Sequence, residues 1–69
     1  MFYVIYNTDN MTKRIVPQSE IYKTLLELQK RGAIFSLDRD NEITYSFEDD
    51  WEGETIEYII ENAILINKR

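Results

Sequence analysis

The sequence contains neither cysteine nor histidine, and it has one proline and two glycines among its 69 residues. Without cysteine the chain forms no disulfide bonds, and without either residue it lacks thiolate and imidazole metal ligands. It also lacks a glycine-rich phosphate loop and a histidine that could serve as a general base. We therefore expect a protein that is not an enzyme, with no catalytic residue, no cofactor and no metal site.

Long apolar runs are missing as well. No stretch approaches the roughly 18 residues of a membrane span, and no basic segment followed by an apolar one marks a signal peptide. We therefore expect a cytoplasmic protein. The chain is nevertheless 43% hydrophobic, too apolar for a disordered tail, and its length suits a single domain over 1–69. A core of this size supplies about 3 to 5 kcal/mol, so oligomer formation or a partner would add stability.

The first third of the chain predicts a hairpin. Residues 2–6 and 11–16 are rich in aromatic and β-branched residues, and the turn formers at 7–10 separate them. The first strand is apolar on both faces, which indicates a central or covered strand. In the second, Lys13 and Arg14 alternate with aliphatic residues, which is typical of an edge strand.

A helix is predicted next, beginning between Pro17 and a possible N-cap at Ser19 and ending at Gly32. Its apolar residues recur at the spacing of one broad stripe that faces the core. The members of this stripe are Ile21, Tyr22, Leu25, Leu26 and Leu28.

A second hairpin is predicted at 33–37 and 42–47, joined by a polar turn at 38–41. Strict alternation in its second strand indicates one buried and one solvated face. The residues expected to be buried are Ile43, Tyr45 and Phe47, and those expected to be solvated are Glu42, Thr44 and Ser46.

The last predicted helix is capped by Thr55 or Gly53 and continues to Ile64. A short final strand over 63–66, after a break at Asn62, is the less favoured alternative. The resulting order β-β-α-β-β-α, with two antiparallel hairpins and two helices, predicts a small two-layer α+β domain in which the helices cover one face of an antiparallel sheet.

Negative charge is concentrated in the second half of the chain. Residues 38–61 contain ten acidic residues and one basic residue, a net charge of −9, whereas residues 1–37 carry +2 and the whole chain carries −5. Such a field repels nucleic acid and attracts a basic protein surface. A solvated face that only keeps the protein soluble is the plainer reading, but the imbalance is steeper than solubility requires.

The candidate partner-binding residues lie where these acids surround the one tryptophan. They are Glu48, Asp49, Asp50, Trp51, Glu52 and Glu57. Trp51 either folds over the sheet as part of the core or stands out as an aromatic anchor with an acidic rim. The sequence leaves both readings open.

Two chemical interpretations of the acids, a calcium site and a hydrolytic pair, are less favoured than partner binding. Asp38, Asp40 and Glu42 have the spacing of the first half of a calcium loop, but Ile43 stands where such a loop needs glycine, so a solvated hairpin turn is preferred. A pair of loop carboxylates such as Glu48 and Asp49 could share acid and base roles in hydrolysis, but a domain this small offers little room for a substrate cavity.

A helix carrying Leu25, Leu26 and Leu28, then Gly32, a hairpin and a closing isoleucine-rich helix make up residues 25–66. This part of the chain resembles the TubC-type N-terminal docking domains of nonribosomal peptide and polyketide assembly lines. The resemblance implies that the hairpin 33–47 accepts a partner segment as an added strand. The N-terminal hairpin has no counterpart in that family.

We therefore expect a small acidic, non-enzymatic protein–protein interaction module without direct nucleic-acid or membrane contacts. Its bias toward Ile, Asn, Lys and Tyr, which have AT-rich codons, suggests a low-GC bacterium or a phage. The specific form we favour is a phage or mobile-element inhibitor that mimics DNA and binds a basic surface of a nucleic-acid-handling host protein. The alternatives are a docking domain that accepts a strand at 33–47 and a homo-oligomeric structural protein such as a homodimer.

Overall fold

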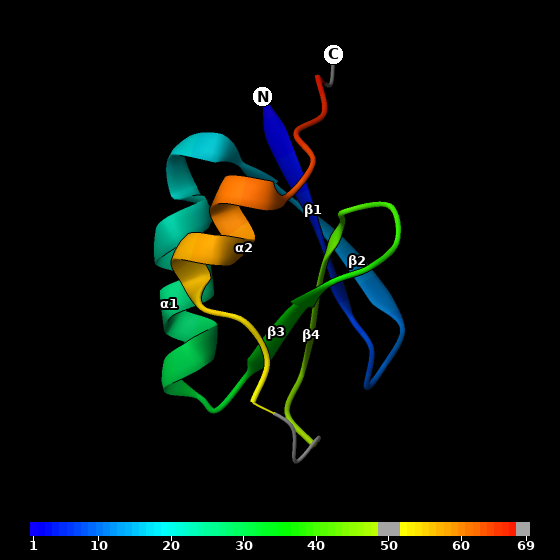
Figure 1. The fold of residues 1–69 in the computed structure, drawn as a ribbon, viewed down its shortest axis with the longest axis vertical. Coiled ribbons are helices and arrows are strands. Elements are labelled where there is room, and N and C mark those ends of the chain that lie inside the picture. Colours follow the sequence, from blue (N-terminus) through cyan, green and yellow to red (C-terminus); the bar gives the residue numbers. More distant parts are fainter. Residues whose placement is uncertain (49–51, 68–69) are drawn as a thin grey trace.

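The computed structural model describes residues 1–48 and 52–67, which form a four-stranded sheet with both helices on one of its faces (Figure 1). The elements in chain order are β1 (Phe2–Asn7), β2 (Thr12–Pro17), the short 3-10 helix η1 (Gln18–Glu20), α1 (Ile21–Lys30), β3 (Ile34–Leu37), β4 (Ile43–Ser46) and α2 (Ile56–Asn62). The predicted α+β class and the element order are confirmed.

The strand order is β2-β1-β4-β3, so β1 is internal and β2 lies at an edge, as predicted. Both hairpins are antiparallel, but β1 and β4 run parallel, with Ile5 opposite Ile43. The expectation of a wholly antiparallel sheet is therefore wrong. Parallel pairing brings the carboxyl ends of β1 and β4 to the same end of the sheet, although they lie far apart in the sequence.

The core lies between the helices and the face of the sheet that they cover. Its buried hydrophobic residues are Tyr3, Ile5, Val16, Ile21, Leu25, Ala33, Phe35, Ile43, Ile56 and Ile59. The predicted stripe of α1 is confirmed for Ile21 and Leu25, but Tyr22 is 50% exposed. Successive residues of a helix are about 100° apart, so a side chain next to the centre of the stripe can already point to solvent.

The ends of α1 follow from backbone hydrogen bonding. Gly32 has a φ of +100° and donates to Gln29 O, while the N–H of Ala33 donates to Leu28 O, which is the Schellman arrangement. The predicted stop at Gly32 is confirmed. The predicted N-cap at Ser19 is wrong, because η1 intervenes and α1 begins at Ile21 without a side-chain cap.

The hydroxyl of Thr55 accepts a hydrogen bond from the N–H of Tyr58 at 3.1 Å, so the predicted cap of α2 is confirmed. The helix ends at Asn62, and the prediction that it continues to Ile64 is wrong. Instead Phe2 and Ile66 exchange two backbone hydrogen bonds of 2.8 Å, and Ile64 N–H donates to Asn41 O. Backbone partners at Phe2 of β1 and at Asn41 of the β3–β4 turn therefore hold this segment outside the helix, in agreement with the less favoured alternative of a break at Asn62.

The predicted alternation of β4 fails at its carboxyl end. Ser46, expected in solvent, is 3% exposed, and Phe47, expected in the core, is 39% exposed. The hydroxyl of Ser46 donates to the carboxylate of Asp9 at 2.7 Å, and the N–H of Phe47 donates to the same carboxylate at 2.8 Å. A satisfied hydroxyl can be buried at small cost, so these contacts with the β1–β2 turn override the alternation.

Candidate functional site

The fold divides the acidic half of the chain between two ends of the sheet. Glu42 immediately precedes β4 and Glu48 lies two positions after its end, so the four strand residues and Phe47 separate them, a distance of at most about 20 Å. This separation exceeds the screening length of roughly 10 Å at 0.1 M salt. The acids at the β3–β4 turn and those beyond β4 therefore contribute to the electrostatic field at different places on the surface.

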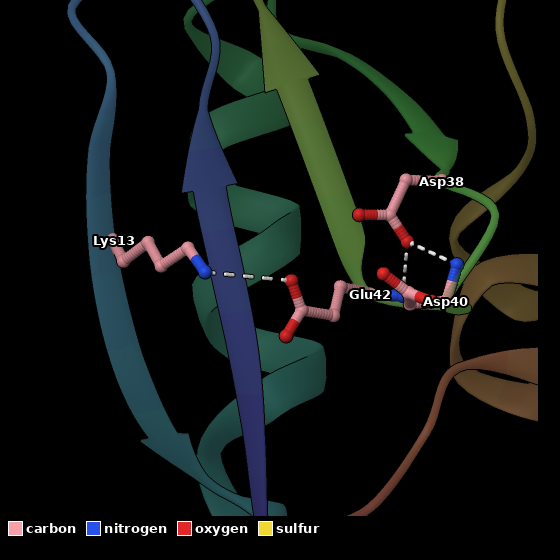
Figure 2. A network of polar contacts seen from close by, with 4 residues as sticks. All are labelled: Lys13, Asp38, Asp40 and Glu42. Carbon is pink, nitrogen blue, oxygen red and sulfur yellow. Dashed lines mark hydrogen bonds and ion pairs between the residues drawn. The ribbon is translucent and has the colours of Figure 1, made fainter.

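Two acids at the β3–β4 turn, Asp38 and Glu42, are engaged by the protein itself (Figure 2). Asp38 Oδ1 accepts hydrogen bonds of 2.9 Å from the backbone N–H groups of Asp40 and Glu42. Glu42 Oε1 lies 3.7 Å from Lys13 Nζ, which reaches across β1 from β2. The calcium-like spacing of these acids thus belongs to a hairpin turn, in which Asn41 adopts a φ of +60°.

Among the predicted partner-binding residues, Glu48 and Glu52 belong to residues 48–54, here called the acidic loop, and Glu57 lies in the first turn of α2. All three side chains are exposed. The remaining predicted residues, Asp49, Asp50 and Trp51, lie outside the described residues. The choice between a core role and an interface role for Trp51 therefore stays a prediction.

Ion pairing does not neutralise these three glutamates within residues 1–48 and 52–67. Lys13 with Glu42 is the one ion pair found there, and it lies at the other end of the sheet. Glu54 and Glu61 are also exposed and lie just before α2 and in its last turn. The described glutamates from 48 to 61 thus present uncompensated charge.

Tyr58 is a candidate contact that the sequence reading missed. Its side chain is 47% exposed on the solvent side of α2, where its neighbours in the helix are Glu57 and Glu61. A helical projection could have found it, because position 58 lies about 200° from Ile56, which is buried. Tyr58 therefore presents an exposed aromatic ring with acidic side chains beside it.

The outer edge of β3, where the docking alternative would add a strand, is partly used by the chain. The N–H of Glu54 donates to Phe35 O at 2.8 Å. Gly53, with a φ of +71°, passes so close to this edge that a Cβ there would lie 2.7 Å from Phe35 O. A partner strand could pair beside Leu37, but next to Phe35 it would have to displace residues 53 and 54.

Over the described part of the chain no pocket opens, and no group of three acidic side chains converges in a way that could hold a metal ion. Neither α1 nor α2 is long and apolar enough to cross a membrane. No family model matches the sequence, and no curated protein or solved structure shows significant similarity to it.

Proposed function

We propose that this protein is a non-enzymatic interaction module that binds a basic surface of another protein through the acids of its second half. The observation that carries the proposal is the set of exposed glutamates between residues 48 and 61 with no cationic partner among the described residues. Charge left uncompensated steers a partner of opposite sign toward these glutamates.

The form of the module that we favour is an inhibitor, carried by a phage or mobile element, that occupies the nucleic-acid site of a host protein. Duplex DNA presents one negative charge per about 1.7 Å of its axis. Glu57 and Glu61 are one helical turn apart on the exposed side of α2, about 6 Å, and the acidic loop precedes them. Tyr58 between them supplies an aromatic contact of the kind that dominates binding energies.

The test is an affinity capture from lysate at low and at high salt, followed by mass spectrometry. We expect a nucleic-acid-handling protein that is captured at low salt and lost at high salt, because the attraction is screened. Capture that is indifferent to salt would overturn the electrostatic proposal.

A matched pair of variants sharpens this experiment. Replacing Glu48→Lys together with Glu57→Lys changes the net charge from −5 to −1, and so does replacing Glu20→Lys with Glu27→Lys. All four side chains are exposed, so both variants should fold. We expect capture to fall at least tenfold only for the first pair. An equal loss for the two pairs would mean that net charge, and not this surface, determines binding.

A further inference from the structure

The two edges of the sheet differ in how the chain treats them. At the β3 edge the N–H of Glu54 donates to Phe35 O, so part of that edge is already paired. At the β2 edge no further strand of the described chain is present, and residues 12–15 are all exposed. Figure 2 shows β2 as the outermost strand. The β2 edge is therefore where another chain could extend this sheet.

The backbone groups that β2 directs outward belong to Lys13 and Ile15. On the inner side, the N–H of Gln18 donates to Met1 O at 3.0 Å, which continues the β1–β2 ladder. Hydrogen-bonded and non-bonded pairs alternate in such a ladder, so the even-numbered residues of β2 bond to β1 and the odd-numbered ones face outward. No loop within residues 1–48 and 52–67 supplies a backbone bond to these outward groups.

The same alternation explains the position of Pro17 at the end of β2. Its register partner Phe2 uses its N–H and C=O for Ile66, on the side away from β2, so Phe2 and Pro17 form a non-bonded pair. The proline therefore costs no bond to β1, but it offers no donor to an added strand. The free edge is thus limited to residues 12–16.

Exposed edges are commonly protected by a lysine that points past them. Lys13 instead turns back across β1, with its Nζ 3.7 Å from Glu42 Oε1 and 5.9 Å from the centre of the Tyr6 ring (Figure 2). Its neighbour on the same face, Ile15, is apolar and 40% exposed. On this face the β2 edge therefore presents an isoleucine, not a charge, to an approaching strand.

Arg14 is the charged residue that such a strand would meet on the other face. It lies opposite Ile5, which is in the core, so it shares the helix-side face of the sheet with Val16. Its side chain is exposed, and no acidic side chain of residues 1–48 and 52–67 forms an ion pair with it. An acidic side chain directly opposite Arg14 would be stabilised, and a basic one would be repelled.

We propose that the β2 edge, residues 12–16, binds an extended segment of another protein as an added antiparallel strand. The segment carries an apolar residue opposite Ile15 and, next to it, an acidic residue opposite Arg14. Main-chain hydrogen bonds to Lys13 and Ile15 supply the affinity, and the two side-chain positions supply the specificity. This inference goes beyond the proposed function, since it concerns a separate surface and a partner segment of the opposite charge.

A second copy of this chain is a poorer occupant of the edge. If two β2 edges pair so that every outward group is satisfied, Lys13 of each copy lies opposite Ile15 of the other. The two Arg14 side chains then lie directly opposite one another, which is destabilising. Each copy also carries a net charge of −5. The edge therefore suits a different chain.

The first experiment titrates the full chain, observed by NMR, with the blocked synthetic peptide Thr-Val-Ile-Glu-Thr-Thr, whose Ile and Glu would take the positions opposite Ile15 and Arg14. We expect the amide signals of Lys13 and Ile15 to shift and their exchange with solvent to slow at least threefold. The exchange of Arg14, whose N–H faces β1, should not change. No response at β2 up to roughly 5 mM peptide would overturn the proposal.

The backbone contribution is tested at Ile15. Ile15→Pro removes an outward donor but no bond to β1, so the variant should fold and bind the peptide at least tenfold more weakly. Ile15→Val keeps the donor and should bind within twofold of the original chain. Circular dichroism checks that both variants are folded. Equal binding by the two folded variants would contradict strand addition.

The side-chain contribution is tested by exchanging charges, which does not depend on the proline variant. Replacing the glutamate of the peptide by lysine should weaken binding at β2 about fivefold, and Arg14→Glu should reverse this preference. Arg31→Glu is the control, because it changes the net charge equally, from −5 to −7, at the end of α1 that leads to β3. A preference that Arg14→Glu leaves unchanged would refute the pairing with Arg14.

The same spectra separate this proposal from the proposed function. A basic peptide that binds the acidic surface shifts the signals of Glu57 and Glu61, whereas strand addition shifts those of Lys13 and Ile15. A response at one set of signals without the other would support one proposal and contradict the other.

Discussion

The two faces of the sheet differ in burial, because one packs against both helices and the other, the open face, is not covered by them. The face toward the helices contains Ile43 at 0% exposure and Phe35 at 1%, whereas Ile15 on the open face is 40% exposed. On the first, burial of apolar side chains stabilises the fold. On the second, the same residue types remain in contact with water, and an ion pair lies beside them. Apolar composition alone therefore does not separate the residues that hold this chain together from those that are available to a partner.

The largest expected effect compares isoleucine with isoleucine across the sheet. We expect Ile43→Ala to cost about 2 to 5 kcal/mol, because it leaves a cavity in a closed core. Ile15→Ala should cost less than about 1 kcal/mol at concentrations where the protein is monomeric. Denaturant unfolding of the two variants measures both values. Equal losses would show that the open face is as closed as the core.

The next effect concerns the segment that closes the β3 edge. Gly53→Ala should cost roughly 2 to 4 kcal/mol, because the new methyl group would collide with Ile34 and with Phe35 O at a positive φ. Gly32→Ala is the control, since its φ is also positive but nothing lies within 4 Å of the added carbon. Thermal melting should rank Gly53→Ala well below Gly32→Ala. The reverse order would show that residues 53 and 54 do not pack against β3.

A smaller effect is expected at the start of α2, which covers the core. Thr55→Ala removes the acceptor for the N–H of Tyr58 and should cost about 1 kcal/mol. Thr55→Ser keeps the hydroxyl and should be nearly neutral. The two variants can be compared by chemical denaturation. A serine variant as unstable as the alanine variant would mean that the methyl group, and not the hydrogen bond, is what matters.

The smallest effect is expected on the open face itself. Lys13→Gln breaks the ion pair with Glu42. The side chains of Lys13 and Glu42 are 61% and 27% exposed, so the substitution should change the unfolding free energy of the monomer by less than about 1 kcal/mol. A loss of several kcal/mol in dilute solution would show that this ion pair is a structural element. The contrast between a structural face and an open face would then be wrong.

Local rules predicted the parts of the fold whose causes are local. The stop of α1 at Gly32 follows from its left-handed backbone, and the start of α2 follows from the hydroxyl of Thr55. The failures at Ser46 and Ile64 share another cause, which is a hydrogen-bond partner 23 or more residues away in the sequence. Alternation and helical spacing describe residues within one element and take no account of so distant a partner. They therefore gave the wrong result at these two places.

The candidate site shows the same limit. The sequence located the excess of carboxylates, but it could not tell that Asp38 and Glu42 are engaged within the fold while Glu48, Glu52 and Glu57 remain exposed. It also did not anticipate Asp9, which the parallel pairing of β1 and β4 brings to the end of β4, next to Glu48. Counting charges along a chain does not specify which of them share a surface.

The sequence by itself determined the α+β class, the element order and the sign of the charge in each half, because these depend on residue type and on spacings within one element. Only the tertiary structure decided that β1 pairs in parallel with β4, that the tail returns to Phe2, and that the second face of the sheet stays open beside an ion pair. These features are pairings between distant segments, and a distant pairing depends on the free energy of the whole fold.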